Sequence, residues 1–316
     1  MSRNPVFFNI VPSPPDARDW NTEPVFDENV RKPRRYLDLR SELKPIRNQG
    51  KQGTSAAHVG VCMAEYQVRK NKQLKKQLLS PQFLYDQRED QDKSTMCGRE
   101  IMKMMAKMGV CQELSYPYEK NKEKTEVGAA LLEEASLCKI QNYAQVHTIS
   151  ALKKALFVNG PCFISFPVYN HTVKMWVQHK GEVCLGGHAM TVVGYDKKGF
   201  ILRNSWGLYW KKKGYCHFPY KDWGCQYEVW TIVKPESYLI PRWKITEWTH
   251  KYVKRGYKWT RGKVLDFLGI DFLELQKRPS SNEPNTFILE SKKESGMGDL
   301  FPENNTFEQS ADDAGD

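Results

Sequence analysis

Apolar side chains recur at spacings of three and four positions after Ala56, which places them on one face of an α-helix. The pattern predicts a helix that begins at Ser55 and ends at about Asn71, with Glu65 and other charged side chains facing outward. The apolar face consists of Val59, Cys62, Met63 and Tyr66.

Three shorter helices are predicted farther along the chain. Ser80-Pro81 is typical of a helix start, with a serine cap and proline at the first helical position. A helix over residues 100–108 would end at Gly109, since glycine commonly terminates helices. Another is predicted over residues 149–158, with an apolar face of Leu152, Leu156 and Phe157.

The second half of the pattern is rich in strands. Short, almost continuous apolar runs at residues 160–168, 189–193, 200–203 and 229–233 indicate buried strands. The expected fold class is therefore α+β. We expect one domain over residues 35–234, with a helical lobe over about 35–145 and a β lobe over about 146–234.

The remaining segments differ from this domain in composition. Residues 1–34 are proline-rich and charged and indicate an extended leader without a core of its own. Residues 235–278 form a basic, aromatic extension. Residues 279–316 are acidic and poor in apolar side chains, which predicts a disordered tail.

Charge alone does not identify a partner. The chain has 48 Lys and Arg against 37 Asp and Glu, a formal net charge of +11. Nucleic acid or an anionic surface would fit such a charge, and the basic aromatic segment 235–278 is the place where either would bind. No basic helix, RNA-binding signature or zinc-finger signature accompanies the charge, so solvated lysines and aromatics packed on the β lobe are the favoured interpretation.

The eight cysteines lack paired C-x-x-C spacing, so we expect neither a metal site nor a cofactor. The chain as given shows no signal peptide, and no apolar run reaches the length of a membrane span. These features favour a reducing compartment, in which the cysteines would remain thiols.

Three motifs, in this order, resemble those of papain-like cysteine peptidases: residues 46–58 with Gln49 and Ser55, residues 187–195 with His188, and the run Asn204-Ser205-Trp206-Gly207. Ser-Pro-Gln-Phe-Leu at 80–84 and Tyr-Pro-Tyr at 116–118 lie between them, and the resemblance spans about residues 36–234. It implies the two-lobed papain-like fold, with the active site in the cleft between the lobes. The short leader is similar to that of compact bacterial and giant-virus members.

The resemblance also implies a role for each site residue. Ser55 occupies the position of the nucleophilic cysteine, at a helix N-terminus that favours negative charge. His188 would act as base and then acid, and Asn204 would orient its ring. Gln49 and the backbone N–H of Ser55 would form the oxyanion hole, and Trp206 would shield the His–Asn hydrogen bond. We therefore expect a peptide or protein substrate.

Other positions depart from the family or allow two interpretations. Gly98 and Gly187 would line the substrate rim, although one glycine of the family motif is lost beside Gly98. Gln52 replaces a family cysteine, so its disulfide to the region of Cys97 cannot form. His58 lies one turn beyond the nucleophile position and is assigned to core packing. The family's β-lobe disulfide would join Cys184 to Cys216 or Cys225, unless these residues remain thiols.

Three functional hypotheses remain. The chain is a cysteine peptidase whose nucleophile was replaced deliberately to prevent self-cleavage, or a natural serine-bearing relative that hydrolyses weakly or only binds peptides. In the third, it is a structural or packaging protein that acts through residues 235–278. The leader likewise has two interpretations: a cover that lies in the cleft, or a strap on the domain surface.

Overall fold

The computed structural model describes residues 8–19, 22, 33–69, 71, 74–89, 94–118 and 127–233. It also describes the backbone of two short antiparallel strands, β8 (Leu239–Pro241) and β9 (Thr286–Ile288). The predictions for the extension 235–278 and the tail 279–316 otherwise lie outside the described residues, as does the first part of the leader.

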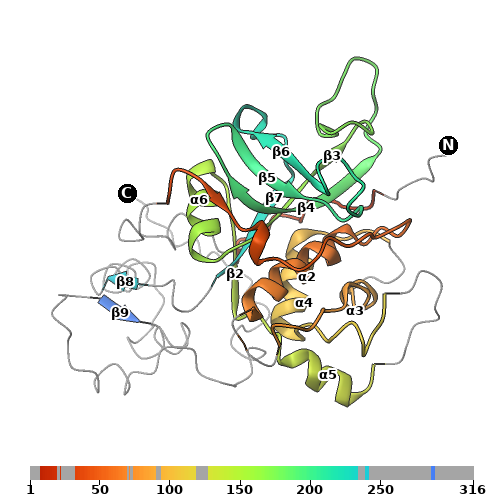
Figure 1. The fold of residues 1–316 in the computed structure, drawn as a ribbon, viewed down its shortest axis with the longest axis vertical. Coiled ribbons are helices and arrows are strands. Elements are labelled where there is room, and N and C mark those ends of the chain that lie inside the picture. The colour runs from red at the N-terminus through yellow and green to blue at the C-terminus, as the bar shows by residue number, and fades with distance from the viewer. Residues whose placement is uncertain are drawn as a thin grey trace, which may run out of the picture.

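Most helices gather in one lobe and the main sheet lies in the other, which confirms the predicted α+β class (Figure 1). In the figure the helical lobe is drawn below the sheet, and one further helix lies beside the sheet. The helical lobe consists of α2 (Ser55–Val68), α3 (Pro81–Asp86), α4 (Gly98–Lys107) and α5 (Ala129–Ser136). The helix beside the sheet is α6 (Ile149–Val158).

Helix α2 begins at Ser55 as predicted and ends three residues before the predicted end. The prediction that Glu65 faces outward is wrong. Its side chain is 5% exposed and forms an ion pair with Arg47 at 2.8 Å. All of residues 55–66 are buried, because α2 packs against the other helices on one side and against the sheet on the other.

The helix ends largely follow the sequence signals. The Ser80 hydroxyl accepts a hydrogen bond from the Phe83 amide at 3.0 Å, as the predicted cap requires. Helix α4 begins at Gly98, two residues before the predicted start, and Gly109 leaves it with a φ of +82°. Helix α5 was not predicted. In α6, Phe157 is only half-buried, and the alanines at 151 and 155 complete the apolar face.

The sheet has seven antiparallel strands in the order β2-β7-β3-β4-β5-β6, with β1 paired to the far end of β4. All four predicted strands are present, and β1, β2 and β6 are additional. The strands are β1 (Leu37–Asp38), β2 (Asn142–Gln145), β3 (Cys162–Val168), β4 (Gly186–Tyr195), β5 (Gly199–Arg203), β6 (Tyr215–Pro219) and β7 (Glu228–Val233).

The sheet is buried on both faces at its centre. Phe163 of β3 and Ala189 of β4 belong to the core shared with the helices, whereas Ile164 and Met190 belong to the core of the β lobe. This alternation follows from the two-residue period of a strand. Burial on both faces explains why these strands appear as continuous apolar runs. The residues of β4 that face the helices pack against α2.

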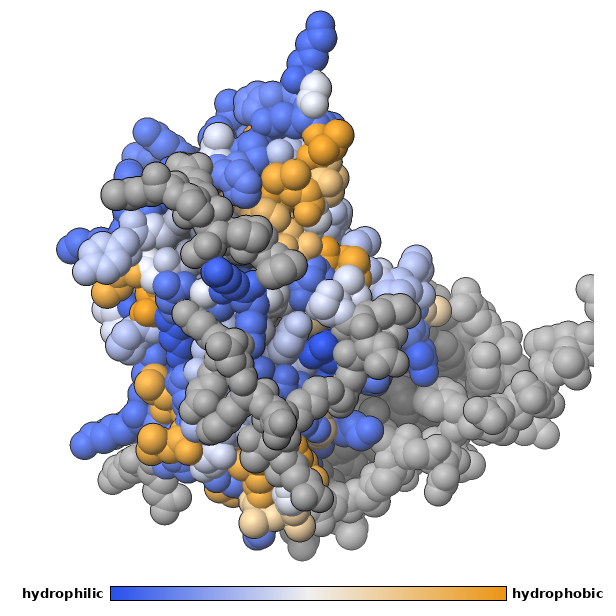
Figure 2. Space-filling model, turned by 90° about the vertical axis from the view of Figure 1, so that its right-hand side faces the viewer, coloured by the Kyte–Doolittle hydropathy of each residue, from blue (hydrophilic) through white to orange (hydrophobic). Residues whose placement is uncertain are grey.

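All eight cysteines of the sequence lie among the described residues, and all are free thiols. Cys184, Cys216 and Cys225 are among these free thiols, so the family's β-lobe disulfide is not formed in this structure. In the described part of the chain, no helix combines the length and the apolar character that a membrane crossing demands. Hydrophilic residues cover most of the described surface on the face drawn in Figure 2.

Candidate active site

Ser55 is the first residue of α2 and is 1% exposed. Its hydroxyl oxygen accepts a hydrogen bond from the backbone N–H of Ala189 at 3.3 Å, which brings the helix tip against β4. The first N–H groups of a helix have no intrahelical acceptor, and the helix dipole adds partial positive charge there. The site around Ser55 therefore favours negative charge on this side chain.

His188 precedes Ala189 on β4 and is fully buried. Its Nε2 lies 2.8 Å from Oδ1 of Asn204. Because an amide oxygen only accepts hydrogen bonds, Nε2 carries the proton and Nδ1 keeps a free lone pair. Nδ1 has no hydrogen-bond partner among the described residues. The ring is thus held in the tautomer that can accept a proton.

Burial lowers the pKa of His188 to about 4, and the hydrogen bond to Asn204 opposes this shift only in part. The ring is therefore neutral at pH 7. Oδ1 of Asn204 also accepts the backbone N–H of Ser205 at 2.8 Å, which fixes the orientation of the amide.

The Trp206 ring covers the His–Asn pair. Its centroid lies 4.6 Å from that of His188, with the two planes inclined by 30°. Trp210 packs against the other edge of Trp206 at 5.5 Å. His188 and Asn204 are themselves buried, so their hydrogen bond lies out of contact with bulk water.

Gln49 is completely buried and is tied to the loop that carries Asn204. Its Oε1 accepts the Ser205 hydroxyl at 2.5 Å, and its backbone N–H donates to the Ser205 carbonyl at 2.8 Å. Its Nε2 donates one proton to the Gln52 carbonyl at 2.9 Å. The second Nε2 proton has no such bond among the described contacts.

The leader runs along these residues. The Ile10 amide donates to the Gly187 carbonyl at 3.1 Å, and the Phe8 ring lies 6.1 Å from His188 and 6.2 Å from Trp206. A Cβ on Gly187 would collide with the Ile10 carbonyl, so glycine allows the close approach of the two backbones. Ile10 is only 2% exposed.

Met96 supplies the other backbone contacts of the leader. Its N–H donates to the Asn9 carbonyl at 3.1 Å, and its carbonyl accepts the Val11 amide at 3.0 Å. Sequence reasoning missed Met96, because every residue type has the backbone groups it uses. The predicted Gly98 has a different role here, since its amide donates to the Glu228 carboxylate at 2.6 Å.

Farther along, the leader is attached by polar side chains. The Ser13 amide donates to Glu228 at 3.3 Å, and the Ser13 hydroxyl accepts the Arg99 amide at 3.1 Å. The Arg99 guanidinium forms two hydrogen bonds with the Asp19 carboxylate. The Arg99 and Asp19 side chains are 9% and 11% exposed, so this ion pair is largely shielded from water.

His58 belongs to the core, as predicted. Its Nδ1 lies 3.0 Å from the Thr54 carbonyl, and its ring meets the Tyr118 ring edge-on at 5.0 Å. Burial lowers the pKa of His58 to about 3, although the hydrogen bond to Thr54 acts in the other direction. His58 is therefore neutral and has its own backbone partner.

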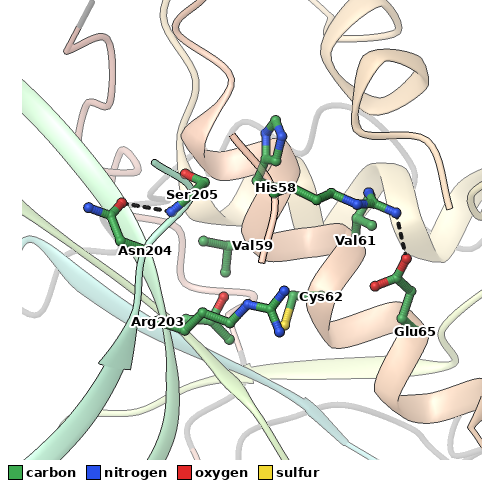
Figure 3. A pocket seen from close by; sticks show the side chains of 10 residues that line it. His58, Val59, Val61, Cys62, Glu65, Arg203, Asn204 and Ser205 are labelled. Carbon is green, nitrogen blue, oxygen red and sulfur yellow. Dashed lines mark hydrogen bonds and ion pairs between the residues drawn. The ribbon is translucent and has the colours of Figure 1, made fainter. Parts of the chain in front are cut away.

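A small polar cavity lies behind the site, between α2 and β5 (Figure 3). Arg203 of β5 points toward Cys62 there and donates to the carbonyls of Lys44 and Pro45, each at 2.7 Å. On the other side, Arg47 pairs with Glu65. These bonds fix the segment that leads to Gln49. In the described part of the chain, no three His, Cys, Asp or Glu side chains converge as a metal ion would require.

A helical lobe, an antiparallel sheet with a buried His–Asn pair, and a helix tip that is hydrogen-bonded to the residue after that histidine make up a papain-like architecture. A family model described as papain family cysteine protease matches residues 33–232. The chain belongs to the papain family of cysteine proteases.

Individual relatives agree with this assignment. An uncharacterised peptidase C1-like protein of Acanthamoeba polyphaga mimivirus is 28% identical, over 76% of this chain and 90% of that protein. Cathepsin K of Mus musculus is 30% identical, over 57% of each chain. A viral cathepsin of Adoxophyes honmai nucleopolyhedrovirus is 26% identical, over 66% of this chain and 61% of that protein.

Solved structures show the same fold. Xylellain, a cysteine protease from Xylella fastidiosa, superimposes with a TM-score of 0.63 at 24% identity, over 74% of this chain and 99% of that chain. A procathepsin B from Trypanosoma congolense gives a TM-score of 0.54 at 16% identity, over 66% of this chain and 80% of that chain.

Proposed function

We propose that this chain is a peptidase scaffold in which Ser55 stands at the position of the nucleophile and His188 is its base. The chain as written then turns over peptides very slowly or not at all. The observation that carries the proposal is the free Nδ1 of His188, on a ring fixed by Asn204 and next to the residue that binds the Ser55 hydroxyl.

The chain also offers candidates for the remaining parts of an acyl-transfer site. Such a reaction needs donors aimed at the oxyanion, besides a nucleophile and a base. The Ser55 backbone N–H at the helix tip and the remaining Nε2 proton of Gln49 are the two candidate donors. Gln49 is held by Ser205 through both its backbone and its side chain, so this donor is preorganised.

Serine at this position explains why low activity is expected. A cysteine at a helix tip beside histidine ionises readily, and its thiolate is the nucleophile. A serine hydroxyl must lose its proton during attack, and a neutral His188 with a pKa of about 4 is a weak base. General-base assistance contributes about 10²–10⁴-fold in a well-aligned site, and a site shaped for the larger sulfur atom loses part of it.

The substrate class follows from the family and from the leader. Members of the papain family act on peptides and proteins, and the backbone hydrogen bonds of Asn9, Ile10 and Val11 resemble those that an extended peptide makes. We therefore propose that the leader covers the site and competes with substrate. These backbone hydrogen bonds favour the interpretation of the leader as a cover over its interpretation as a surface strap.

The test is the activity of the Ser55→Cys variant of the full chain against a peptide library, read by mass spectrometry. The restored thiol should cleave peptides and be inhibited by thiol-directed epoxides and vinyl sulfones. The parent should be at least about 100-fold slower. A Ser55→Cys variant that is folded by circular dichroism but cleaves no peptide would remove the enzyme interpretation.

A second candidate function is peptide binding without hydrolysis by a natural serine-bearing protein. The leader lying along Gly187 and Met96 supports this candidate, because an extended segment forms backbone hydrogen bonds there while Ser55 is present. Measurable cleavage by the parent that disappears in Ser55→Ala would exclude pure binding. The third hypothesis, a structural role of residues 235–278, concerns residues outside the described part of the chain.

A further inference from the structure

The turn that follows Trp206 forms an exposed tip that is both basic and apolar. We call residues 208–213, Leu-Tyr-Trp-Lys-Lys-Lys, the basic tip. Leu208 is 57% exposed, Tyr209 is fully exposed, and all three lysines at 211–213 are exposed. Exposed apolar side chains next to a run of like charges are typical of a surface that binds a charged polypeptide.

The basic tip is connected to the candidate active site by a series of contacting aromatic rings. Trp206 lies 4.6 Å from His188, and Trp210 of the basic tip lies 5.5 Å from Trp206. The Phe8 ring of the leader also rests on Trp206, at 6.2 Å. A leader side chain therefore already contacts Trp206 in this structure, and Trp206 in turn contacts the basic tip through Trp210.

Among the described residues, the lysines of the basic tip form no ion pair. No acidic residue occurs between positions 197 and 221, or between positions 43 and 64, the segment that pairs with Trp206 and its neighbours. Asp38, whose charge reaches Tyr215 just beyond the tip, is already held by Arg40 through both carboxylate oxygens. The positive charge is thus available to a ligand.

The backbone holds the lysines in a defined arrangement. Lys211 and Lys213 have φ values of +49° and +53°, a region that is costly for residues with a Cβ and that favours glycine. The Gly214 amide closes the turn by donating to the Trp210 carbonyl at 2.6 Å. Two lysines of the basic tip therefore adopt backbone conformations that have a lower energy in glycine. The turn that holds them is closed by a backbone hydrogen bond.

Chemistry decides which part of a substrate meets this tip. After attack, the histidine must give its proton to the departing amine. The segment that follows the scissile bond therefore begins at His188, and its next residues pass Trp206, which covers that ring. The basic tip adjoins this position, because its Trp210 contacts Trp206.

From this geometry we infer that the basic tip selects substrates with acidic residues a few positions after the scissile bond. This inference rests on the proposed function, because it takes His188 as the proton donor to the leaving amine. It assigns Lys211, Lys212 and Lys213 as specificity determinants for an acidic peptide segment.

The test compares two versions of a peptide that the full-length Ser55→Cys variant cleaves. One has glutamates at the second to fourth positions after the scissile bond, and the other has glutamines. The glutamate peptide should show a kcat/KM about three-fold higher or more at low ionic strength, because a few exposed ion pairs give an effect of this size. The difference should shrink at high salt.

Two charge-reversal variants separate the basic tip from net charge. Lys211→Glu with Lys212→Glu should abolish or invert the preference for glutamate. Lys197→Glu with Lys198→Glu changes the net charge equally, at exposed positions after the far end of β4. These control lysines lie roughly 20 Å along the strand from His188, so this variant should keep the preference.

The outcomes distinguish this inference from the proposed function. Equal cleavage of both peptides, or equal loss of preference in both variants, overturns the inference and leaves the proposed function standing. If Ser55→Cys cleaves no peptide, the proposed function fails. In that case, fluorescently labelled versions of the two peptides are compared for binding to the parent. Equal affinity overturns the inference. Tighter binding of the glutamate peptide supports it, provided that the variant with Lys211→Glu and Lys212→Glu loses this difference.

Discussion

At the scale of single residues, the site depends on two buried neutral histidines with different roles. Nδ1 of His188 has no hydrogen-bond partner among the described residues, whereas Nδ1 of His58 faces the Thr54 carbonyl. The sequence motifs predict that His188 is the base, and the place of His58 near a helix N-terminus predicted its core position. They could not predict Met96, which acts through its backbone, or the burial of Glu65, which depends on how the two lobes enclose α2.

Burial of these rings predicts acid destabilisation. Burial lowers the pKa of His58 to about 3, well below the 6.5 of an exposed histidine. Between these values the unfolded chain binds a proton that the folded chain does not, so stability falls as the pH drops below 6.5. At pH 5 the loss from His58 is about 2 kcal/mol.

Urea unfolding at pH 7 and pH 5 measures this contribution. The His58→Gln variant should lose about 2 kcal/mol less than the parent between the two pH values. His179→Gln, which removes an exposed ring, is the matched control and should lose as much as the parent. An unchanged loss in His58→Gln would contradict the account of a buried neutral His58.

At the scale of elements, the sequence predicted those with strong local signals. The serine cap and proline of α3, the apolar face of α2 and the continuous apolar runs of β3 and β4 all reflect local physics. Helix α5 and the short strands β1 and β2 have weak local patterns and depend on tertiary contacts. The position of the leader also depends on tertiary contacts, so the sequence left two alternatives open: a cover in the cleft or a strap on the domain surface.

The leader gives an element-scale prediction. Asp19→Asn removes the carboxylate that holds the Arg99 guanidinium, a charged hydrogen-bonded contact worth about 1.5–3 kcal/mol. Weakening it should open the site. In a Ser55→Cys background, the rate of labelling at position 55 by a peptidyl vinyl sulfone should then rise roughly ten-fold.

Asp16→Asn is the control for this substitution. Asp16 pairs with Arg18 inside the leader, so the variant removes the same charge without breaking the contact with Arg99. Its labelling rate should match that of Ser55→Cys alone. Identical rates for the Asp19 and Asp16 variants, together with no increase on deleting residues 1–34, would make the leader a surface strap.

At the scale of the whole molecule, the candidate site exists only because two lobes meet. Ser55 comes from the helical lobe, and His188 and Asn204 come from the β lobe. Gln49 and the segment before it are fixed by Ser205, Arg203 and backbone bonds across the same boundary. The order of the family motifs predicted that the two lobes are in contact, although no local sequence pattern indicates such a contact.

The most direct test of this arrangement is the labelling rate of Ser55→Cys by a peptidyl vinyl sulfone, with the modified residue mapped by mass spectrometry. The account predicts fast labelling at position 55, at least about 100-fold slower when His188→Ala is added, because the thiolate depends on that ring. The parent, with its eight other thiols, should show no labelling at this position. Labelling at position 55 that is absent, or that is unaffected by His188→Ala, would contradict the pairing of Ser55 with His188.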